Sequence, residues 1–150
     1  MKRIGIYCGS FNPFHNGHKN IYEKALAMFD EVFIAVGINP DKDTSNMYER
    51  REFISDLMKP AKVIAYQGLT TNLIKRFQKE MPDSSITLIR GLRDGYDLDY
   101  EIKALRFMQD LMPEIQVVMI VGDREFSYLS SSSIRALEKL GSDLEKRYLP

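Results

Sequence analysis

The chain has 150 residues, 44% of them hydrophobic, and its 21 basic and 21 acidic residues give a formal net charge of zero. This size and composition predict one domain, residues 1–150, built around a single core. The balanced charge argues against a nucleic-acid partner, which usually requires a basic excess. No stretch approaches the roughly 20 apolar residues of a membrane span, and the first apolar run is too short for a signal peptide. The single cysteine, Cys8, cannot form an internal disulfide. We therefore expect a cytoplasmic protein without a membrane partner.

Five short apolar runs alternate with five helical patterns along the chain. The runs cover residues 3–7, 31–37, 62–66, 85–89 and 115–121. Their richness in Ile and Val is typical of strands that are buried on both faces of a parallel sheet. Repeated strand–helix alternation predicts an α/β fold, namely a Rossmann-like, doubly wound parallel sheet of five strands. We expect the strand order 3-2-1-4-5.

The helical patterns place apolar side chains at intervals of three and four residues. The first pattern covers residues 18–29 and aligns Ile21, Ala25, Met28 and Phe29, and the second covers residues 48–58 and aligns Phe53, Ile54 and Leu57. The third includes Leu73, Ile74 and Phe77, and the fourth covers residues 98–112 and aligns Leu98, Ile102, Leu105, Met108 and Met112. The last covers residues 131–140, with Ile134 and Leu137 facing inward. Gly141 is a typical helix terminator.

The expected strand order brings the first and fourth strands together, at the point where the chain reverses direction. Ligands of such sheets bind in the crevice at the carboxyl ends of these strands. The first strand is followed by "CGSFNPFHNGH", residues 8–18, and the fourth by "RGLRDGYD", residues 90–97. The two segments richest in polar and basic groups should therefore face each other.

Both histidines of the chain lie in the first of these segments. His15 and His18 are three residues apart and precede a helical pattern. The N–H groups at a helix N-terminus favour phosphate, and two imidazoles on one face could bind its oxygens. Two alternatives remain open at this point. The histidines could cap the helix or lie on the surface, or they could bind zinc together with Cys8, although a fourth ligand has no obvious source.

Two further segments carry groups that suit phosphate. Arg90 and Arg93 flank Gly91, and the planar guanidinium matches phosphate oxygens, although solvated arginines are the alternative. Glu101 could favour the N-terminus of the next helix or bind a ribose hydroxyl. Residues 130–133 are four serines at the start of the last helix, which either cap it or form a second phosphate cradle. By itself, Lys42 in its polar loop is typical of the solvated surface.

Together these segments resemble the nucleotidylyltransferases with an HxGH signature, here "HNGH" at residues 15–18, followed late in the chain by "SSSSIR". The segments "LIRGLRDGYDLDYE", "LMPE" and "EFSYLSSS" are similar in order and spacing to those of the phosphopantetheine adenylyltransferase family. The likeness runs from about residue 3 to residue 140. It implies transfer of an adenylyl group from ATP, with magnesium, to 4′-phosphopantetheine, which gives dephospho-coenzyme A and pyrophosphate in coenzyme A biosynthesis. It also implies a homohexamer, a dimer of trimers.

The resemblance assigns roles to individual residues. His18 matches the family's transition-state residue and, with Lys42 and Arg90, forms the implied catalytic set. Nucleotide contacts fall on Ser10, Phe11, His18, Gly91, Leu92, Arg93, Glu101, Phe126, Ser127, Tyr128, Leu129, Ser130, Ser131 and Ser132. Acceptor contacts fall on Ser10, Lys42, Ile74 and Arg90. No residue is assigned as a metal ligand.

The opening segment departs from this family, whose pattern is closer to "PGTFDPxTxGH". Cys8, Asn12 and His15 replace its proline, aspartate and hydroxyl residue, and "GSFNPFHNGH" is nearer the nicotinamide mononucleotide adenylyltransferases. Nicotinamide mononucleotide is therefore the alternative acceptor, and a nucleotide-binding module without catalysis is the alternative outside the enzymes. The middle segment, which carries the expected acceptor-phosphate positions, favours phosphopantetheine.

Overall fold

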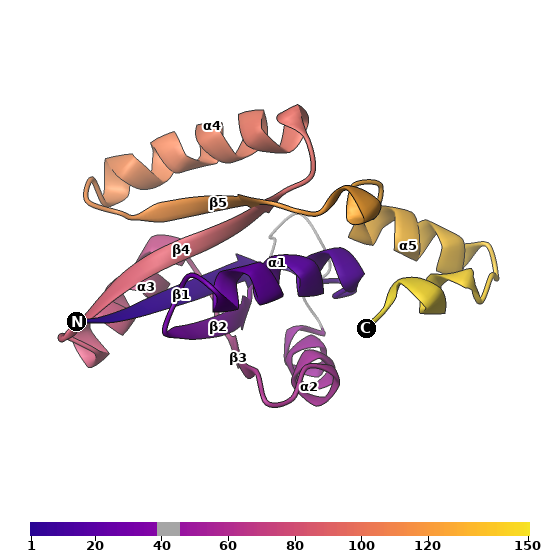
Figure 1. Ribbon diagram of the computed structural model, residues 1–150, viewed down its shortest axis with the longest axis horizontal. Coiled ribbons are helices and arrows are strands. Elements are labelled where there is room, and N and C mark those ends of the chain that lie inside the picture. Colours follow the sequence, from indigo (N-terminus) through magenta and orange to yellow (C-terminus); the bar gives the residue numbers. More distant parts are fainter. Residues whose placement is uncertain (39–45) are drawn as a thin grey trace.

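The computed structural model describes residues 1–38 and 46–150. Its centre is a parallel sheet with the order β3-β2-β1-β4-β5, which confirms the predicted topology (Figure 1). The strands are β1 (Lys2–Gly9), β2 (Glu31–Val36), β3 (Lys62–Ala65), β4 (Ser84–Leu92) and β5 (Val117–Val121). In this order β1 is the central strand, and it pairs with β2 on one side and with β4 on the other.

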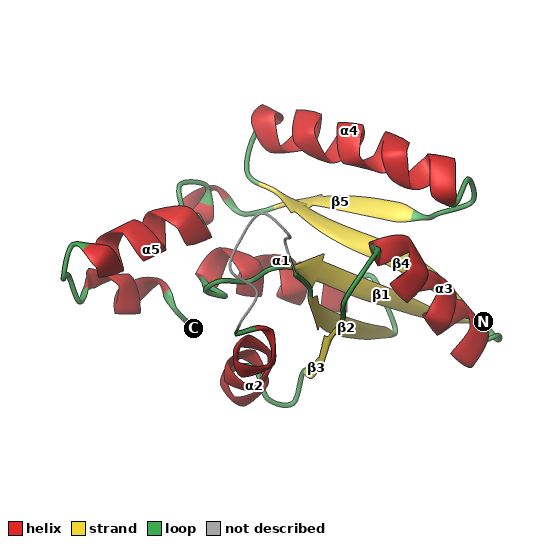
Figure 2. Cartoon of the chain, turned by 180° about the vertical axis from the view of Figure 1, so that it is seen from behind, coloured by secondary structure: helices red, strands yellow, loops and turns green. Residues whose placement is uncertain are grey.

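Helices cover both faces of the sheet. They are α1 (Asn16–Leu26), α2 (Met47–Leu57), α3 (Thr70–Glu80), α4 (Gly95–Leu111) and α5 (Ser131–Lys139), with short 3-10 turns η1 (Arg124–Phe126) and η2 (Leu144–Tyr148). The helices α1 and α2 pack on one face, while α3 and α4 pack on the other, as the views from front and back show (Figures 1 and 2). The helix α5 lies beyond the carboxyl ends of the strands. Within the described residues, no helix has the length and apolar character needed to cross a membrane.

The core forms two layers because neighbouring strand residues point to opposite faces. On β2, Ile34 belongs to the cluster beneath α1 and α2, whereas the next residue, Ala35, belongs to the cluster beneath α3 and α4. Both are fully buried. A strand enclosed on both sides has no polar face, which explains why the strands read as continuous apolar runs.

The helical patterns were only partly right about which side chains face inward. The helix α1 ends at Leu26, so Met28 lies beyond it and is exposed. On α2 the buried side is centred on Ile54, and Phe53, about 100° away around the helix, is half exposed. Leu98 and Ile102 of α4 are also exposed in the single chain.

The fourth strand is longer than the sequence predicts. It continues through Gly91 to Leu92, where it still pairs with β5. Glycine usually signals a turn, but here its missing side chain allows α1 to pack closely. A Cβ at Gly91 would lie only 2.9 Å from Cγ1 of Ile21. Arg90 is thus held in regular sheet rather than in a loop. The fifth strand starts at Val117, two residues later than predicted.

Candidate active site

A cavity of about 350 Å³ opens at the carboxyl ends of β1 and β4. Its walls come from the segment after β1, the end of β4, the start of α4 and the segment between β5 and α5. Of the residues named from the sequence, it is lined by Ser10, Phe11, His18, Arg90, Gly91, Leu92, Arg93, Glu101, Phe126, Ser127, Leu129, Ser130, Ser131 and Ser132. The structure therefore brings together the three polar segments, as the strand order predicts.

Two of the site residues named from the sequence do not line this cavity. Ile74 is fully buried in the core, because it lies on the side of α3 that faces the sheet. Tyr128 is 67% exposed, and its ring packs edge-on against that of Tyr148. Lys42 lies outside the described residues. The expected apolar slot at the Ile74 side chain is thus not part of this cavity.

The segment after β1 folds back sharply at Phe11. This residue has a φ of 47°, in the left-handed region that costs a non-glycine residue about 1 kcal/mol or more. The turn places the Phe11 ring over Gly9, where a Cβ would lie 2.9 Å from Cζ of the ring. The ring then packs edge-on against both Tyr7 and His18, with centroids 5.0 Å apart in each case. The turn thus supports the His18 imidazole from one side.

The two histidines form a reciprocal cap at the start of α1. Nδ1 of His15 accepts from the backbone N–H of Gly17 at 3.0 Å, and Nδ1 of His18 accepts from the backbone N–H of His15 at 3.1 Å. Their rings stack with centroids 3.7 Å apart. Because Nδ1 is an acceptor in both rings, each neutral imidazole carries its proton on Nε2. His18 thus combines capping with a donor that serves the cavity.

Burial keeps both imidazoles uncharged. It lowers the pKa of His15 from 6.5 to about 4, with a further contribution from Arg93. Burial is also the main reason that the pKa of His18 lies well below 6.5, and His15 and the nearby arginines lower it further. At neutral pH the His18 side chain therefore offers a hydrogen bond rather than a positive charge.

The zinc alternative is not supported. In residues 1–38 and 46–150 no three His, Cys, Asp or Glu side chains are placed to hold a metal ion. The Cys8 side chain lies on the opposite face of β1 from Tyr7, in the core beneath α3 and α4. Burial raises the pKa of its thiol to about 12, which disfavours the thiolate that zinc binds.

Arg90 is held in a fixed orientation at the end of β4. Its Nε and Nη2 donate to the two carboxylate oxygens of Glu101 at 2.9 and 2.8 Å, and its Nη1 donates to the carbonyl oxygen of Cys8 at 2.6 Å. Glu101 is almost completely buried. In this structure Glu101 orients Arg90 through a bidentate ion pair, a role that the sequence did not reveal.

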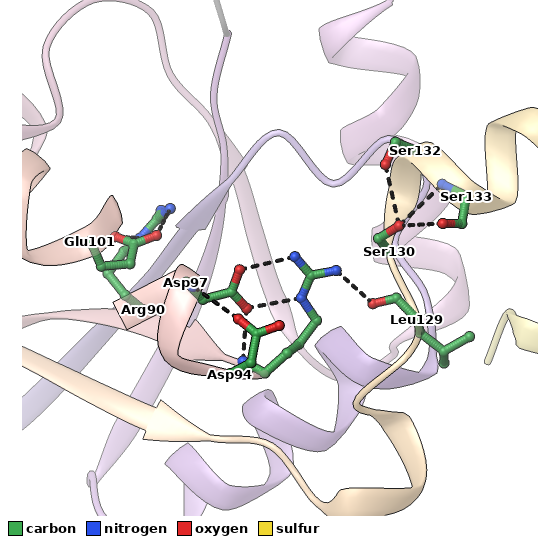
Figure 3. A network of polar contacts seen from close by, with 9 residues as sticks. Arg90, Asp94, Asp97, Glu101, Leu129, Ser130, Ser132 and Ser133 are labelled. Carbon is green, nitrogen blue, oxygen red and sulfur yellow. Dashed lines mark hydrogen bonds and ion pairs between the residues drawn. The ribbon is translucent and has the colours of Figure 1, made fainter. Parts of the chain in front are cut away.

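Arg93 connects the start of α4 to the segment that leads into α5. Its Nε and Nη2 bind the carboxylate of Asp97 at 2.9 and 3.0 Å, and its Nη1 donates to the carbonyl oxygen of Leu129 at 3.2 Å (Figure 3). Asp94 caps α4 by accepting from the backbone N–H of Asp97 at 3.0 Å. The sequence analysis assigned no role to Asp97, and its pair with Arg93 depends on the turn that leads into α4.

The serine run both caps α5 and attaches it to the segment after β1. Ser130 is the N-cap, and its Oγ accepts from the backbone N–H of Ser133 at 3.1 Å. Oγ of Ser131 donates to the carbonyl oxygen of Pro13 at 2.9 Å, and Arg135 donates to that of Asn12 at 2.5 Å. The N-terminus of α5 therefore borders the same cavity as that of α1, and both of the readings left open for the serines suit this placement.

The segment after β5 is attached to α1 by a contact that sequence reasoning missed. The side chain of Asn20 donates to the carboxylate of Asp123 and accepts from the backbone N–H of that residue, both at 2.8 Å. Nζ of Lys24 lies 2.6 Å from the other carboxylate oxygen. Asn20 and Asp123 are 103 positions apart, so no local pattern could have revealed the contact.

Comparison with known proteins agrees with this geometry. The cytidylyltransferase-like family model matches residues 6–137. Two curated phosphopantetheine adenylyltransferases are similar over nearly their full length. The enzyme of Porphyromonas gingivalis is 39% identical, over 99% of this chain and 95% of the relative. The enzyme of Buchnera aphidicola is 35% identical, over 100% of this chain and 90% of the relative. The nicotinic acid mononucleotide adenylyltransferase of Plasmodium falciparum, solved with NaAD, superposes with a TM-score of 0.67 at 18% identity, covering 99% of this chain and 91% of the other.

The parallel sheet and the cavity at its switch point, together with these matches, define a nucleotidyltransferase of the cytidylyltransferase-like family. Within this class, the chain belongs to the phosphopantetheine adenylyltransferase family. The resemblance noted in the sequence is thereby confirmed. The likeness to the Plasmodium enzyme, at its low identity, concerns the fold.

Proposed function

We propose that the protein transfers the adenylyl group of ATP to 4′-phosphopantetheine, releasing pyrophosphate and forming dephospho-coenzyme A. The observation that carries this proposal is the convergence of phosphate-binding groups on one cavity. His18 supplies a neutral donor, Arg90 and Arg93 supply oriented guanidinium groups, and two helices begin at its edge. The curated relatives named above support the choice of acceptor.

The chemistry requires positioning more than proton transfer. The acceptor is a phosphate monoester, which is largely dianionic at neutral pH because its second pKa is about 6. It can attack the α-phosphorus of ATP without a general base. The obstacles are bringing two polyanions together and stabilising the charge that develops as pyrophosphate leaves. A fixed donor such as the Nε2–H of His18 serves the second purpose without reorganising.

Magnesium suits this site as part of the nucleotide substrate. Asp97 and Glu101, the acidic side chains nearest the two arginines, are already paired with them. Magnesium commonly binds through substrate phosphates while keeping several waters. The proposed substrate is therefore Mg·ATP, with no resident metal held by the described residues.

We assign the acceptor phosphate to Arg90, Lys42 and Ser10. Arg90 and Ser10 line the cavity, and the assignment of Lys42 follows the family resemblance. The assignment of Ile74 to the acceptor also follows the family resemblance, although its side chain is buried in the core.

The test is pyrophosphate release from Mg·ATP, measured in parallel with 4′-phosphopantetheine and with nicotinamide mononucleotide. Release with the first and little with the second is the expected result. The reverse ranking would transfer the proposal to nicotinamide mononucleotide. Nucleotide binding without release in either arm would indicate a module without catalysis. Lys42→Ala should raise the KM for phosphopantetheine far more than that for ATP.

We also propose that the active form is a homohexamer in the cytoplasm. The helix α4 supports an assembly, because contact with another copy of the chain would bury apolar side chains that are exposed in the single chain. These are Leu98, Ile102, Phe107 and Leu111. Light scattering measures the mass directly, and a monomer at working concentration would exclude the hexamer. Cell fractionation tests the location.

A further inference from the structure

Tyr7 is the one tyrosine of β1, and its side chain takes no part in the roles described above. The residue is only 4% exposed, yet it lines the cavity. Its ring forms a cluster with those of Phe11 and His18, at centroid distances of 5.0 and 6.4 Å. Its hydroxyl reaches β4, where it would lie 3.4 Å from a Cβ placed on Gly91.

The Tyr7 hydroxyl forms no hydrogen bond with any residue that the structure describes. The Tyr7 oxygen is not among the fully enclosed polar atoms that lack a partner, so it keeps access to the space of the cavity. By contrast, the partly buried Tyr66 hydroxyl pairs with Thr70 at 3.0 Å. The Tyr7 hydroxyl is therefore a polar group that the folded chain itself leaves unsatisfied at the cavity wall.

The surroundings of this hydroxyl keep it protonated, so it can act as a hydrogen-bond donor. Burial raises the pKa of Tyr7 above its ordinary value, and the nearby Arg90 and Glu101 act in opposite directions on it. The phenol consequently keeps its proton at neutral pH and is available as a donor. The ring of His18, whose Nε2 also carries a proton, is its neighbour in the cavity.

We infer that the Tyr7 hydroxyl is a substrate-binding group that donates a hydrogen bond to a phosphate oxygen of the bound substrate. This inference rests on the proposed function for the identity of the substrates. The phosphate could belong to ATP or to the phosphorylated acceptor. The chemistry is the same in both cases, and separate binding measurements distinguish them.

The test is Tyr7→Phe, which removes one oxygen atom and keeps the ring. Dissociation constants are measured by calorimetry for Mg·ATP and 4′-phosphopantetheine separately, and for their phosphate-free counterparts, adenosine and pantetheine. We expect one phosphorylated ligand to bind about 10- to 100-fold more weakly, the loss typical of one hydrogen bond to a charged group. Its phosphate-free counterpart should bind as before.

The melting temperature of the ligand-free Tyr7→Phe protein distinguishes a substrate-binding role of the hydroxyl from a structural one. Removing an unsatisfied hydroxyl should leave it unchanged or raise it, whereas loss of a structural hydrogen bond would lower it. Tyr22→Phe is the matched control, because Tyr22 is buried in the same core cluster but does not line the cavity. It should leave all four dissociation constants unchanged.

Three results would overturn the inference. These are unchanged binding of both phosphorylated ligands in Tyr7→Phe, an equal loss for a ligand and its phosphate-free counterpart, and a lowered melting temperature with unchanged binding. None of them depends on turnover. Failure of the wild-type protein to release pyrophosphate would instead contradict the proposed function, and the binding measurements would still decide the role of Tyr7.

Discussion

The backbone N–H of His15 lies 3.1 Å from Nδ1 of His18, and this bond determines which nitrogen of the His18 ring carries a proton. With Nδ1 occupied as an acceptor, the neutral ring must donate from Nε2. A helix cap and a catalytic donor are therefore produced by the same contact. The relationship makes His18 sensitive to changes that would matter little at an ordinary helix start.

Replacing His18 by Gln should separate these two functions. Glutamine three residues after the N-cap can accept from the N-cap backbone N–H, as in a capping box, so the melting temperature should stay close to that of the wild type. Turnover should fall by about two to three orders of magnitude, the scale for loss of one preorganised donor. The dissociation constant for ATP should change less, because the contact strengthens in the transition state. Near-normal turnover would remove His18 from the mechanism.

Stability should fall as the pH is lowered from 7 to 5, because His15 and His18 both stay uncharged in the folded protein, and the share of His15 can be stated. The folded-state pKa of His15 is about 4 against an ordinary 6.5, so between these values the unfolded chain binds a proton that the folded chain excludes. The contribution is complete above pH 6.5 and is lost as the pH falls toward 4. At pH 5 the stability already lost amounts to about 2 kcal/mol.

Urea unfolding at several pH values measures this effect. His15→Asn keeps an N-cap side chain without a titrating group, and its stability should depend less on pH in this window. Carboxylates such as Asp97, whose pKa is held below 3.8 by Arg93, remain ionised there and do not obscure the comparison. An identical pH dependence in the two proteins would contradict the assignment to His15.

Glu101→Ala should destabilise the protein and impair use of the acceptor. The change leaves Arg90 without its carboxylate partner in a largely buried position, and breaking such a pair typically costs about 3–5 kcal/mol. We expect a clear loss of stability in chemical denaturation and a raised KM for 4′-phosphopantetheine. Asp99→Ala is the control on the same helix, because its pair with Lys103 is exposed and should matter little. Equal effects of the two substitutions would contradict the role given to Glu101.

Asn20→Leu should raise the KM for ATP by about tenfold with little change in kcat. It removes the two hydrogen bonds between Asn20 and Asp123, each worth about 1 kcal/mol, and leaves only the ion pair with Lys24 to attach the segment that lines the nucleotide side of the cavity. Steady-state kinetics with varied ATP measures the effect. Lys19→Ala, which removes only an exposed pair with Glu23, should behave as the wild type. A fall in kcat alone would mean that Asn20 does not act by positioning this segment.

The sequence was most informative where a pattern repeats or a spacing is local. Alternating strands and helices predicted the parallel sheet, and the expected strand order with the switch-point rule then predicted that residues 8–18 and 90–97 would meet. The fourth strand was cut short in the prediction, which placed residues 90–97 in the loop after it. The reason for glycine at position 91, the close approach of Ile21, involves residues far apart in the chain.

Side-chain roles were harder to predict than positions. The helical spacing of Leu73, Ile74 and Phe77 correctly predicted a buried face, whereas the acceptor role of Ile74 came only from the family resemblance. Arg90 and Glu101 were each identified, yet their mutual ion pair was not, because it depends on how α4 packs against the end of β4. Tyr7 gave no signal at all. A tyrosine inside an apolar strand looks the same whether or not its hydroxyl has a partner.

The attachment of α5 to the segment after β1 has a consequence for how the chain matures. Ser131 and Arg135 bind carbonyl groups 118 and 123 positions earlier, so one wall of the cavity is synthesised long after the segment to which it is attached. Strands β1 to β5 can assemble before it, but they enclose the nucleotide only from one side. Nucleotide present in the cell therefore stabilises the finished chain and gives little help to one still being synthesised, so the sheet must hold together at first without a ligand.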